Sequence, residues 1–251
     1  MTRLLLLGGT TEASRLAKTL VDQGFDAVFS YAGRTYKPVP QPLPTRVGGF
    51  GGVEGLCAFL KAENITHVID ATHPFAAQMS TNAVAACAQT GVPLCAFERA
   101  PWTAQPADAW THVPDLEGAI AALPHDPARV FLAIGKQNLA AFNAAPQHFY
   151  LLRLVDPPGE MLPLQNARAV VARGPFDVQG DTELLRSESI THIVAKNAGG
   201  AGAEAKLIAA RALQIPVILI DRPHVPQRSI RDTLDGVLHW LADHGATPRG
   251  V

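Results

Sequence analysis

The sequence predicts an α/β protein built from two similar halves, each a parallel sheet of about five strands flanked by helices, with a cleft between the halves. Short apolar runs alternate with segments of helical spacing along almost the whole chain. Motifs of the first hundred residues also recur, in the same order, later in the chain. At 251 residues, the chain is long enough for two domains of ordinary size.

The first half opens with the apolar run 4–7, which Gly8 and Gly9 end. A run of this length suits a parallel strand covered on both faces. The segment that follows has apolar residues at helical spacing, and Gly24 fits its C-terminal end. Further strands are predicted at 27–30, 45–47, 67–71 and 93–97, with helices over 11–22, 53–63 and 74–89.

The second half repeats this plan. Strands are predicted at 129–134, 149–155, 169–172, 192–195 and 217–220, with helices over 116–123, near 137–143, and over 181–188, 203–213 and 233–243. Residues 101–114 have no clear periodicity and are typical of a linker. We therefore predict two domains, at residues 1–100 and 101–251.

The repetition extends to sequence motifs. Residues 63–69 are echoed by 188–194, 93–99 by 216–222, 47–50 by 173–176, and Gly9-Thr10 by Gly135-Lys136. The offset falls only from 126 to 123 residues across the half. An internal duplication explains four matches in one register. The alternative is convergence of two unrelated halves on common strand-to-helix turns.

Composition excludes several classes of function. With 21 basic and 22 acidic side chains, the formal net charge is −1, so no overall field favours nucleic acid or an anionic membrane. The histidines and the three cysteines show no metal-ligand spacing, and we expect no metal. No apolar run approaches the roughly 20 residues of a membrane span. We expect a cytoplasmic protein; whether it is a monomer or a homo-oligomer stays open.

The first glycine turn is a candidate phosphate site. Gly8 and Gly9 permit close backbone approach, Thr10 or Thr11 can cap the next helix, and Glu12 lies in its first turn. The unpaired N–H groups at a helix N-terminus favour an anion such as a dinucleotide diphosphate. The alternative is an ordinary strand-to-helix connection, since the full G-x-G-x-x-G pattern is absent.

The end of the second strand points to NADP. NAD-binding folds carry an acid about 20 residues beyond the glycine turn, which binds the ribose. Here Ser30 and Arg34 occupy that region, and both suit a 2′-phosphate. The loops after the next two strands add Gly49, Phe50 and Thr72 to the candidate cofactor contacts. Residues 1–100 are thus the expected NADPH-binding domain.

The strand ends of the second half carry cations instead. These are Lys136, Arg153, Arg173 and Lys196, with Asn197 next to the last. Because ligands of parallel sheets bind at the carboxyl ends of strands, this placement favours a substrate with several carboxylates. Scattered surface charge is the alternative for any one of them. Residues 101–251 are thus the expected substrate domain.

Three titratable side chains are candidate proton donors. Asp70 and His73 follow the fourth strand of the first half, and Lys196 ends the matching strand of the second. A histidine is poised to donate near neutral pH, whereas an aspartic acid needs a raised pKa. Asp70 and Thr72 could instead cap the helix, and water could supply the proton.

Six motifs, in this order, resemble those of the precorrin-6A reductase family, which includes cobalt-precorrin-6A reductases. They are Gly-Gly-Thr-Thr-Glu at 8–12, Ser-Tyr-Ala-Gly-Arg at 30–34, Gly-Gly-Phe-Gly at 48–51, Asp-Ala-Thr-His-Pro-Phe-Ala at 70–76, Arg-Gly-Pro-Phe at 173–176 and Lys-Asn-Ala-Gly-Gly at 196–200. The resemblance implies two Rossmann-like domains and NADPH-dependent reduction of one C=C bond of precorrin-6A to precorrin-6B in cobalamin biosynthesis. The implied substrate bears acetate and propionate groups.

Alternatives to this activity remain open. One is reduction of cobalt-precorrin-6A with NADH or NADPH, and another is a non-catalytic protein that binds NADP or a tetrapyrrole. A short-chain dehydrogenase is disfavoured, because none of the three tyrosines is followed by lysine in Tyr-x-x-x-Lys spacing.

Overall fold

The computed structural model describes residues 2–33, 38–155, 157, 161–172, 174 and 176–249. It divides into two compact units. Unit 1 comprises Met1–Ala100 and His224–Val251, and unit 2 comprises Pro101–Pro223. The sequence predicts domains at residues 1–100 and 101–251; in the structure, residues 224–251 group with unit 1. The cleft expected between the halves stays a prediction.

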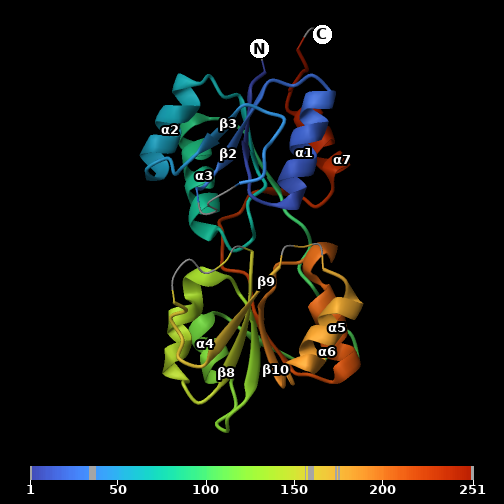
Figure 1. The fold of residues 1–251 in the computed structure, drawn as a ribbon. Helices are drawn as coiled ribbons and strands as arrows, with labels where there is room; N and C mark the ends of the chain where they lie inside the picture. The colour runs from blue at the N-terminus through green and yellow to red at the C-terminus, as the bar shows by residue number, and fades with distance from the viewer. Residues whose placement is uncertain are drawn as a thin grey trace. The chain divides into compact units, whose positions relative to one another are not determined.

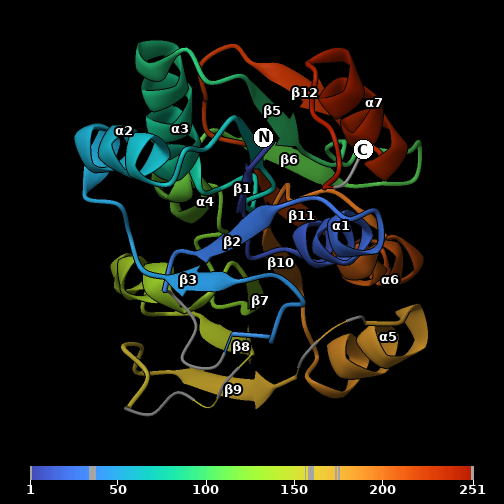
Figure 2. The ribbon, with the colours of Figure 1, turned by 90° about the horizontal axis from the view of Figure 1, so that it is seen from above.

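Unit 1, which contains α1, α2, α3 and α7 in Figure 1, has a six-stranded parallel sheet with the order β12-β5-β4-β1-β2-β3. Its strands are β1 (Leu4–Leu7), β2 (Ala27–Tyr31), β3 (Thr45–Val47), β4 (His67–Asp70), β5 (Leu94–Phe97) and β12 (Ser229–Arg231). Its helices are α1 (Thr11–Asp22), α2 (Gly52–Ala62), α3 (Ala77–Thr90) and α7 (Leu234–Asp243). Figure 2 shows α1 and α7 on one face of the sheet, with α2 and α3 on the other.

The central strand β1 explains why its sequence is continuously apolar. Leu4 and Leu6 pack into the core shared with α1 and α7, whereas Leu5 and Leu7 pack into the core shared with α2 and α3. All four leucines are buried, because successive side chains of a strand point to opposite faces and both faces are covered.

Unit 2 is a second six-stranded parallel sheet, with the order β6-β11-β10-β7-β8-β9. Its strands are β6 (Trp110–Val113), β7 (Arg129–Ala133), β8 (Phe149–Leu154), β9 (Ala167–Val171), β10 (His192–Lys196) and β11 (Val217–Ile220). Its helices are α4 (Leu116–Ala121), α5 (Val178–Ser187) and α6 (Ala205–Leu213), with 3-10 helices η1 (Lys136–Ala144) and η2 (Ala201–Ala203).

The predicted repetition is confirmed by strand order and by local contacts. In unit 1 the Arg3 N–H donates to Thr66 Oγ1 over 3.0 Å, and in unit 2 the Arg129 N–H donates to Thr191 Oγ1 over 3.2 Å. The same arginines pair with Glu63 and Glu188. The turns before β4 and β10 share left-handed residues, Asn64 (φ 51°) and Ser189 (φ 49°).

Each sheet has six strands rather than about five, because each repeat has a sixth strand, which with the helix after it belongs to the other unit. β6 and α4 follow β5 of the first repeat but join the sheet of unit 2; β12 and α7 follow β11 but join the sheet of unit 1. The exchanged pieces match: Asp115 accepts from the Gly118 N–H, and Thr233 accepts from the Gly236 N–H. The prediction that residues 101–114 form a linker is therefore wrong for the part that contains β6.

The described helices contain no stretch with both the length and the hydrophobicity that a membrane crossing requires. The three cysteines are free, and burial raises the pKa of Cys87 to about 12 and that of Cys95 to about 11. These two thiols thus act as small apolar core residues.

Candidate active site

The turn after β1, predicted as a phosphate site, has open space at one of its glycines. The Gly8 N–H donates to Ser30 O over 2.9 Å, which fixes the turn beside the end of β2. Gly9 has φ +126°, and a Cβ built on it would meet nothing within 4 Å. The backbone is thus open to a ligand at Gly9, where only glycine takes this conformation without strain.

Thr10 caps α1 and ties it to β4. Its hydroxyl donates to Ala71 O over 2.8 Å and accepts from the Ala13 N–H over 3.1 Å. The only proton of the hydroxyl is therefore already donated, and we assign no phosphate contact to this group. The cap leaves the N–H groups of Thr11 and Glu12 in the first turn of α1, where helical geometry supplies no acceptor.

Glu12 pairs with a cation of its own unit. Arg99 Nη1 lies 2.9 Å from Glu12 Oε2, and both side chains are about four-fifths buried. The pair neutralises a carboxylate that would otherwise repel an anion at this helix N-terminus. The Glu12 side chain is therefore charge-balanced within unit 1, and the contact of Glu12 with a cofactor stays a prediction.

Ser30 is buried and holds an arginine that the sequence reading missed. Arg46 on β3 donates through Nη1 to Ser30 Oγ over 2.8 Å. Its guanidinium carbon lies 3.9 Å from the ring centroid of Phe50, and Arg46 also donates to the Gly49 carbonyl over 3.1 Å. Three predicted cofactor residues, Ser30, Gly49 and Phe50, thus surround one cation.

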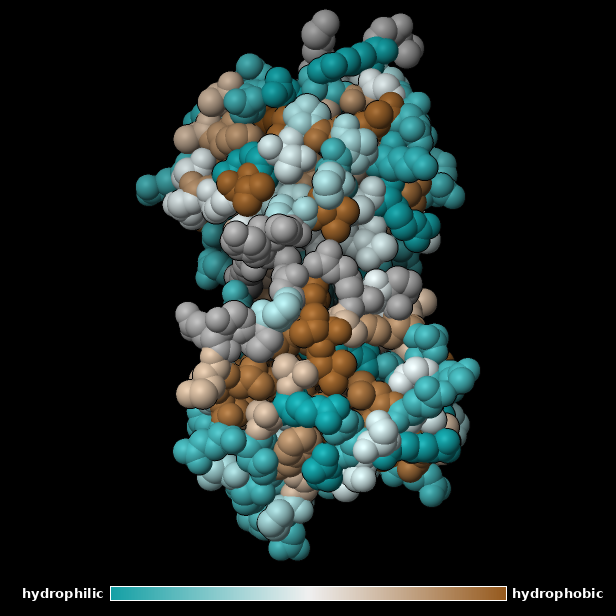
Figure 3. All heavy atoms as spheres, viewed as in Figure 1, coloured by the Kyte–Doolittle hydropathy of each residue, from teal (hydrophilic) through white to brown (hydrophobic). Residues whose placement is uncertain are grey.

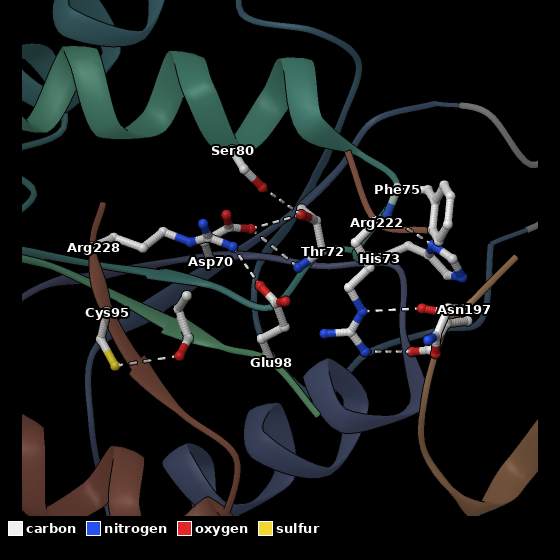
Figure 4. Close-up of polar contacts among 12 residues, drawn as sticks. Asp70, Thr72, His73, Phe75, Ser80, Cys95, Glu98, Asn197, Arg222 and Arg228 are labelled. Carbon is white, nitrogen blue, oxygen red and sulfur yellow. Dashed lines mark hydrogen bonds and ion pairs between the residues drawn. The ribbon is translucent and has the colours of Figure 1, made fainter. Parts of the chain in front are cut away.

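Asp70 organises the turn after β4 (Figure 4). Its Oδ1 accepts from the Thr72 N–H over 3.1 Å and from the Thr72 hydroxyl over 2.7 Å. The Thr72 and Ser80 hydroxyls lie 3.3 Å apart, which links this turn to α3. Asp70 is buried. These contacts hold the turn but do not cap α3, whose N-cap residue, Ala76, has no side-chain cap hydrogen bond.

His73 is exposed and accepts a hydrogen bond on one ring nitrogen. The Phe75 N–H donates to His73 Nδ1 over 3.2 Å, as Figure 4 shows. A neutral ring in this arrangement carries its proton on Nε2. The imidazole therefore has a defined donor at Nε2.

In unit 2, Arg153 forms a buried ion pair with Asp181 of α5. Its guanidinium carbon also lies 4.1 Å from the ring centroid of Phe176. Removing this guanidinium would leave the buried carboxylate of Asp181 without a charge partner, which destabilises the folded state. Arg153 thus helps to hold unit 2 together, and its expected role as a substrate contact stays a prediction.

Asn197 is likewise committed to the fold. The Trp102 N–H donates to Asn197 Oδ1 over 2.8 Å, and Asn197 Nδ2 donates to Trp102 O over 3.1 Å. The same loop is held by Arg222, whose Nε donates to Asn197 O over 3.0 Å (Figure 4). Lys196, which ends β10, is partly buried next to this loop.

The turn after β7 differs from its counterpart in unit 1. The segment from Lys136 forms the 3-10 helix η1 without a side-chain cap, rather than the predicted α-helix. Lys136 itself is exposed. The spacing of apolar residues predicted a helix, but no Ser, Thr or Asp precedes it as a cap and Pro146 limits its length.

Apolar side chains are exposed at the carboxyl ends of neighbouring strands in unit 2. Val155 follows β8 and is 51% exposed, Val171 ends β9 and is 48% exposed, and Val178 begins α5. Figure 3 shows hydrophobic surface on the visible side of unit 2. This edge of the sheet thus offers apolar contact area as well as cations.

Two predicted residues, Arg34 and Arg173, lie outside the described residues. Within the described part of the chain, no group of three or more His, Cys, Asp or Glu side chains is placed to hold a metal ion.

Comparison with known proteins identifies the family. The family model for precorrin-6x reductase CbiJ/CobK matches residues 3–242. A precorrin-6A reductase of Rhodobacter capsulatus is 80% identical over the full length of both chains, and one of a Sinorhizobium species is 48% identical over 96% of this chain and 94% of its own. A cobalt-precorrin-6A reductase of Priestia megaterium is 28% identical, over 96% of this chain and 98% of its own. A solved structure of the CobK precorrin-6A reductase, 80% identical, superimposes with a TM-score of 0.96 over all of both chains. The chain therefore belongs to the precorrin-6x reductase family, as its motifs indicated.

Proposed function

We propose that this chain reduces one C=C bond of precorrin-6A in cobalamin biosynthesis, in the cytoplasm, with NADPH as the hydride donor bound to unit 1. Membership of the family and 80% identity with a precorrin-6A reductase support the reaction. The observation that carries the cofactor assignment is the difference between the two first turns. α1 has a side-chain cap and an open glycine before it, whereas η1 is an uncapped 3-10 helix.

The residues of the first turn fit a dinucleotide. Gly9 leaves space for a diphosphate, and the N–H groups of Thr11 and Glu12 are oriented as donors for it. The ion pair between Glu12 and Arg99 removes the nearest negative charge. When bound, the nicotinamide supplies a hydride, while the protein orients the two reactants and excludes water.

Unit 2 is proposed to hold the substrate. Lys136, exposed in the turn after β7, and Lys196, at the end of β10, are the lysines proposed to bind its carboxylates. Arg153 is paired with Asp181, and Asn197 is used by Trp102. The exposed valines beside β8 and β9 suit the apolar face of a macrocycle.

The proton that follows the hydride is proposed to come from His73 or Lys196, or from bound water. Asp70 is the weakest of the earlier candidates, because its Oδ1 accepts two hydrogen bonds within its own turn. Loss of the proton donor slows proton transfer by roughly 10²- to 10⁴-fold. The pH profiles of His73→Gln and Lys196→Met separate the two side chains.

The test is an anaerobic assay with the full-length protein. Precorrin-6A and cobalt-precorrin-6A are each offered with NADPH and with NADH, and nicotinamide oxidation is followed by absorbance. We expect oxidation of NADPH with precorrin-6A as acceptor. Oxidation with cobalt-precorrin-6A alone would select the alternative substrate. Binding of NADPH without any oxidation would favour a non-catalytic binding protein.

A further inference from the structure

We propose that Arg46 is the residue that selects NADPH over NADH, by binding the 2′-phosphate of the adenosine, and that Ser30 positions Arg46 for this task. The inference rests on the proposed binding of NADPH to unit 1. It assigns the contact with the 2′-phosphate to Arg46 on β3, whereas the sequence predicted Arg34 for this role.

Among the residues that the structure describes, the groups that hold Arg46 are neutral. Nη1 donates to Ser30 Oγ over 2.8 Å and to Gly48 O over 2.9 Å, and Nη2 donates to Gly49 O over 3.1 Å. Phe50 supports one face of the guanidinium. Within the described ranges, no carboxylate pairs with this arginine. Burial without a countercharge lowers the pKa of Arg46, although the group stays protonated at any working pH.

The repeat in unit 2 provides an internal comparison. The sheet register shows that Ser30 and Arg153 are equivalent positions. In unit 1, Ala27 pairs with Leu4, and Ser30 is the third residue after Ala27. In unit 2, Tyr150 pairs with Val130, and Arg153 is the third residue after Tyr150. Arg153 lies on the ring of Phe176, as Arg46 lies on that of Phe50. In each unit a guanidinium thus lies on the phenylalanine that follows the third strand of the repeat. The arginine itself comes from that third strand, β3, in unit 1, but from the second strand, β8, in unit 2.

The two guanidinium groups differ in charge compensation. In unit 2, Asp181 neutralises Arg153. The helices α2 and α5 end in equivalent C-cap residues, Glu63 and Glu188. Counting back seven residues from each C-cap shows that Leu56 of α2 is equivalent to Asp181 of α5. Unit 1 therefore has a buried leucine where unit 2 has the neutralising carboxylate. The charge of Arg46 is left for a ligand, whereas that of Arg153 is not.

The position of Arg46 fits an adenosine 2′-phosphate. Ser30 is adjacent to the first turn, because the Gly8 N–H donates to its carbonyl. In dinucleotide-binding sheets, a diphosphate on the first turn brings the adenosine ribose to the end of the second strand. That is where Ser30 holds Arg46. A guanidinium binds a phosphate dianion through two parallel N–H donors, which the ribose hydroxyl of NADH cannot match.

The test measures dissociation constants of the full-length protein for NADPH, NADH, 2′,5′-ADP and 5′-AMP, without the tetrapyrrole. Wild type, Arg46→Gln, Ser30→Ala and Arg34→Gln are compared, with Arg15→Gln, an exposed arginine of α1, as the charge-matched control. We expect Arg46→Gln to weaken NADPH and 2′,5′-ADP about 10- to 100-fold and to leave NADH and 5′-AMP within about twofold. Ser30→Ala weakens NADPH by a few fold, and Arg15→Gln changes neither nucleotide.

Thermal unfolding of each variant shows whether the fold is retained, and Arg46→Lys provides a second variant that keeps the charge. It should bind NADPH more weakly than wild type and more tightly than Arg46→Gln. An unchanged NADPH preference in a folded Arg46→Gln, or loss of the preference in Arg34→Gln alone, would overturn the inference. A wild type that binds NADPH and NADH equally also overturns it but leaves dinucleotide binding intact. A wild type that binds neither nucleotide refutes the proposed function itself.

Discussion

The ring of Phe29 fills the space in which a side chain at position 8 would begin. A Cβ built on Gly8 falls well inside van der Waals contact of three Phe29 ring atoms. Phe29 is fully buried and shares the core of α1 and α7, so its ring has little freedom to retreat. Gly8 is therefore required by packing, whereas Gly9 faces open space and is the glycine that leaves room for a ligand.

Gly8→Ala should lower the free energy of unfolding by about 1–3 kcal/mol, as overpacking of a core does. Urea unfolding of Gly8→Ala, Phe29→Leu and the double variant measures this. Because Leu removes the opposing ring atoms, Gly8→Ala should cost less in the Phe29→Leu background. Equal costs in both backgrounds would show that the clash with Phe29 is not the cause.

Asp70→Asn should retain turnover within about threefold. The amide keeps an Oδ1 acceptor for both Thr72 donors but cannot act as an acid. Steady-state kinetics with NADPH and precorrin-6A measure the effect. A fall in kcat of roughly 10²-fold or more with an unchanged KM would restore Asp70 as the proton donor.

Asn197→Ala should destabilise unit 2 by about 2–4 kcal/mol. The substitution strands the buried N–H and C=O of Trp102, each at a cost of about 1–3 kcal/mol. Asn143→Ala is the matched control, since Asn143 is exposed and donates one hydrogen bond, to Pro163 O. Its expected cost is below about 1 kcal/mol. Similar stability of both variants would return Asn197 to the substrate contacts.

The free energy of unfolding should decrease as the pH is lowered, and His67 should account for part of this decrease. This side chain is buried, with Nε2 3.0 Å from His244 O, and burial lowers its pKa in the folded state. The unfolded chain therefore binds the proton more readily, so the stabilisation is present above about pH 6.5 and is lost as the pH falls through the lowered folded pKa.

His67→Gln, which cannot titrate, should show a shallower loss of unfolding free energy below about pH 6.5 than wild type. His239→Gln, an exposed histidine of α7, is the control and should follow the wild-type curve. Urea titrations at several pH values measure the slopes. Parallel slopes for His67→Gln and wild type would exclude this histidine as a source of the acid sensitivity.

The sequence predicted most of the fold because buried parallel strands such as Leu4–Leu7 are continuously apolar and the repeated motifs fall in one register. β6 and β12 were missed because both are edge strands of three or four residues with exposed polar positions, so they carry little apolar signal. The related segments Asp115-Leu116-Glu117-Gly118 and Thr233-Leu234-Asp235-Gly236 offered a signal for the exchange.

The site was predicted less completely for a different reason. The first turn follows from local sequence, so its glycines and capping threonine could be recognised. Arg46 could not, because its place beside Ser30 depends on the pairing of β2 with β3, which local sequence does not specify. The structural roles of Arg153 and Asn197 likewise depend on distant partners, Asp181 and Trp102.

The most direct test of the account is a crystal structure of the full-length protein with NADP⁺. We predict the diphosphate against Gly9 and the first turn of α1, with the 2′-phosphate bonded to Arg46. A diphosphate at the turn Gly135-Lys136 of unit 2, or a 2′-phosphate without contact to Arg46, would contradict it.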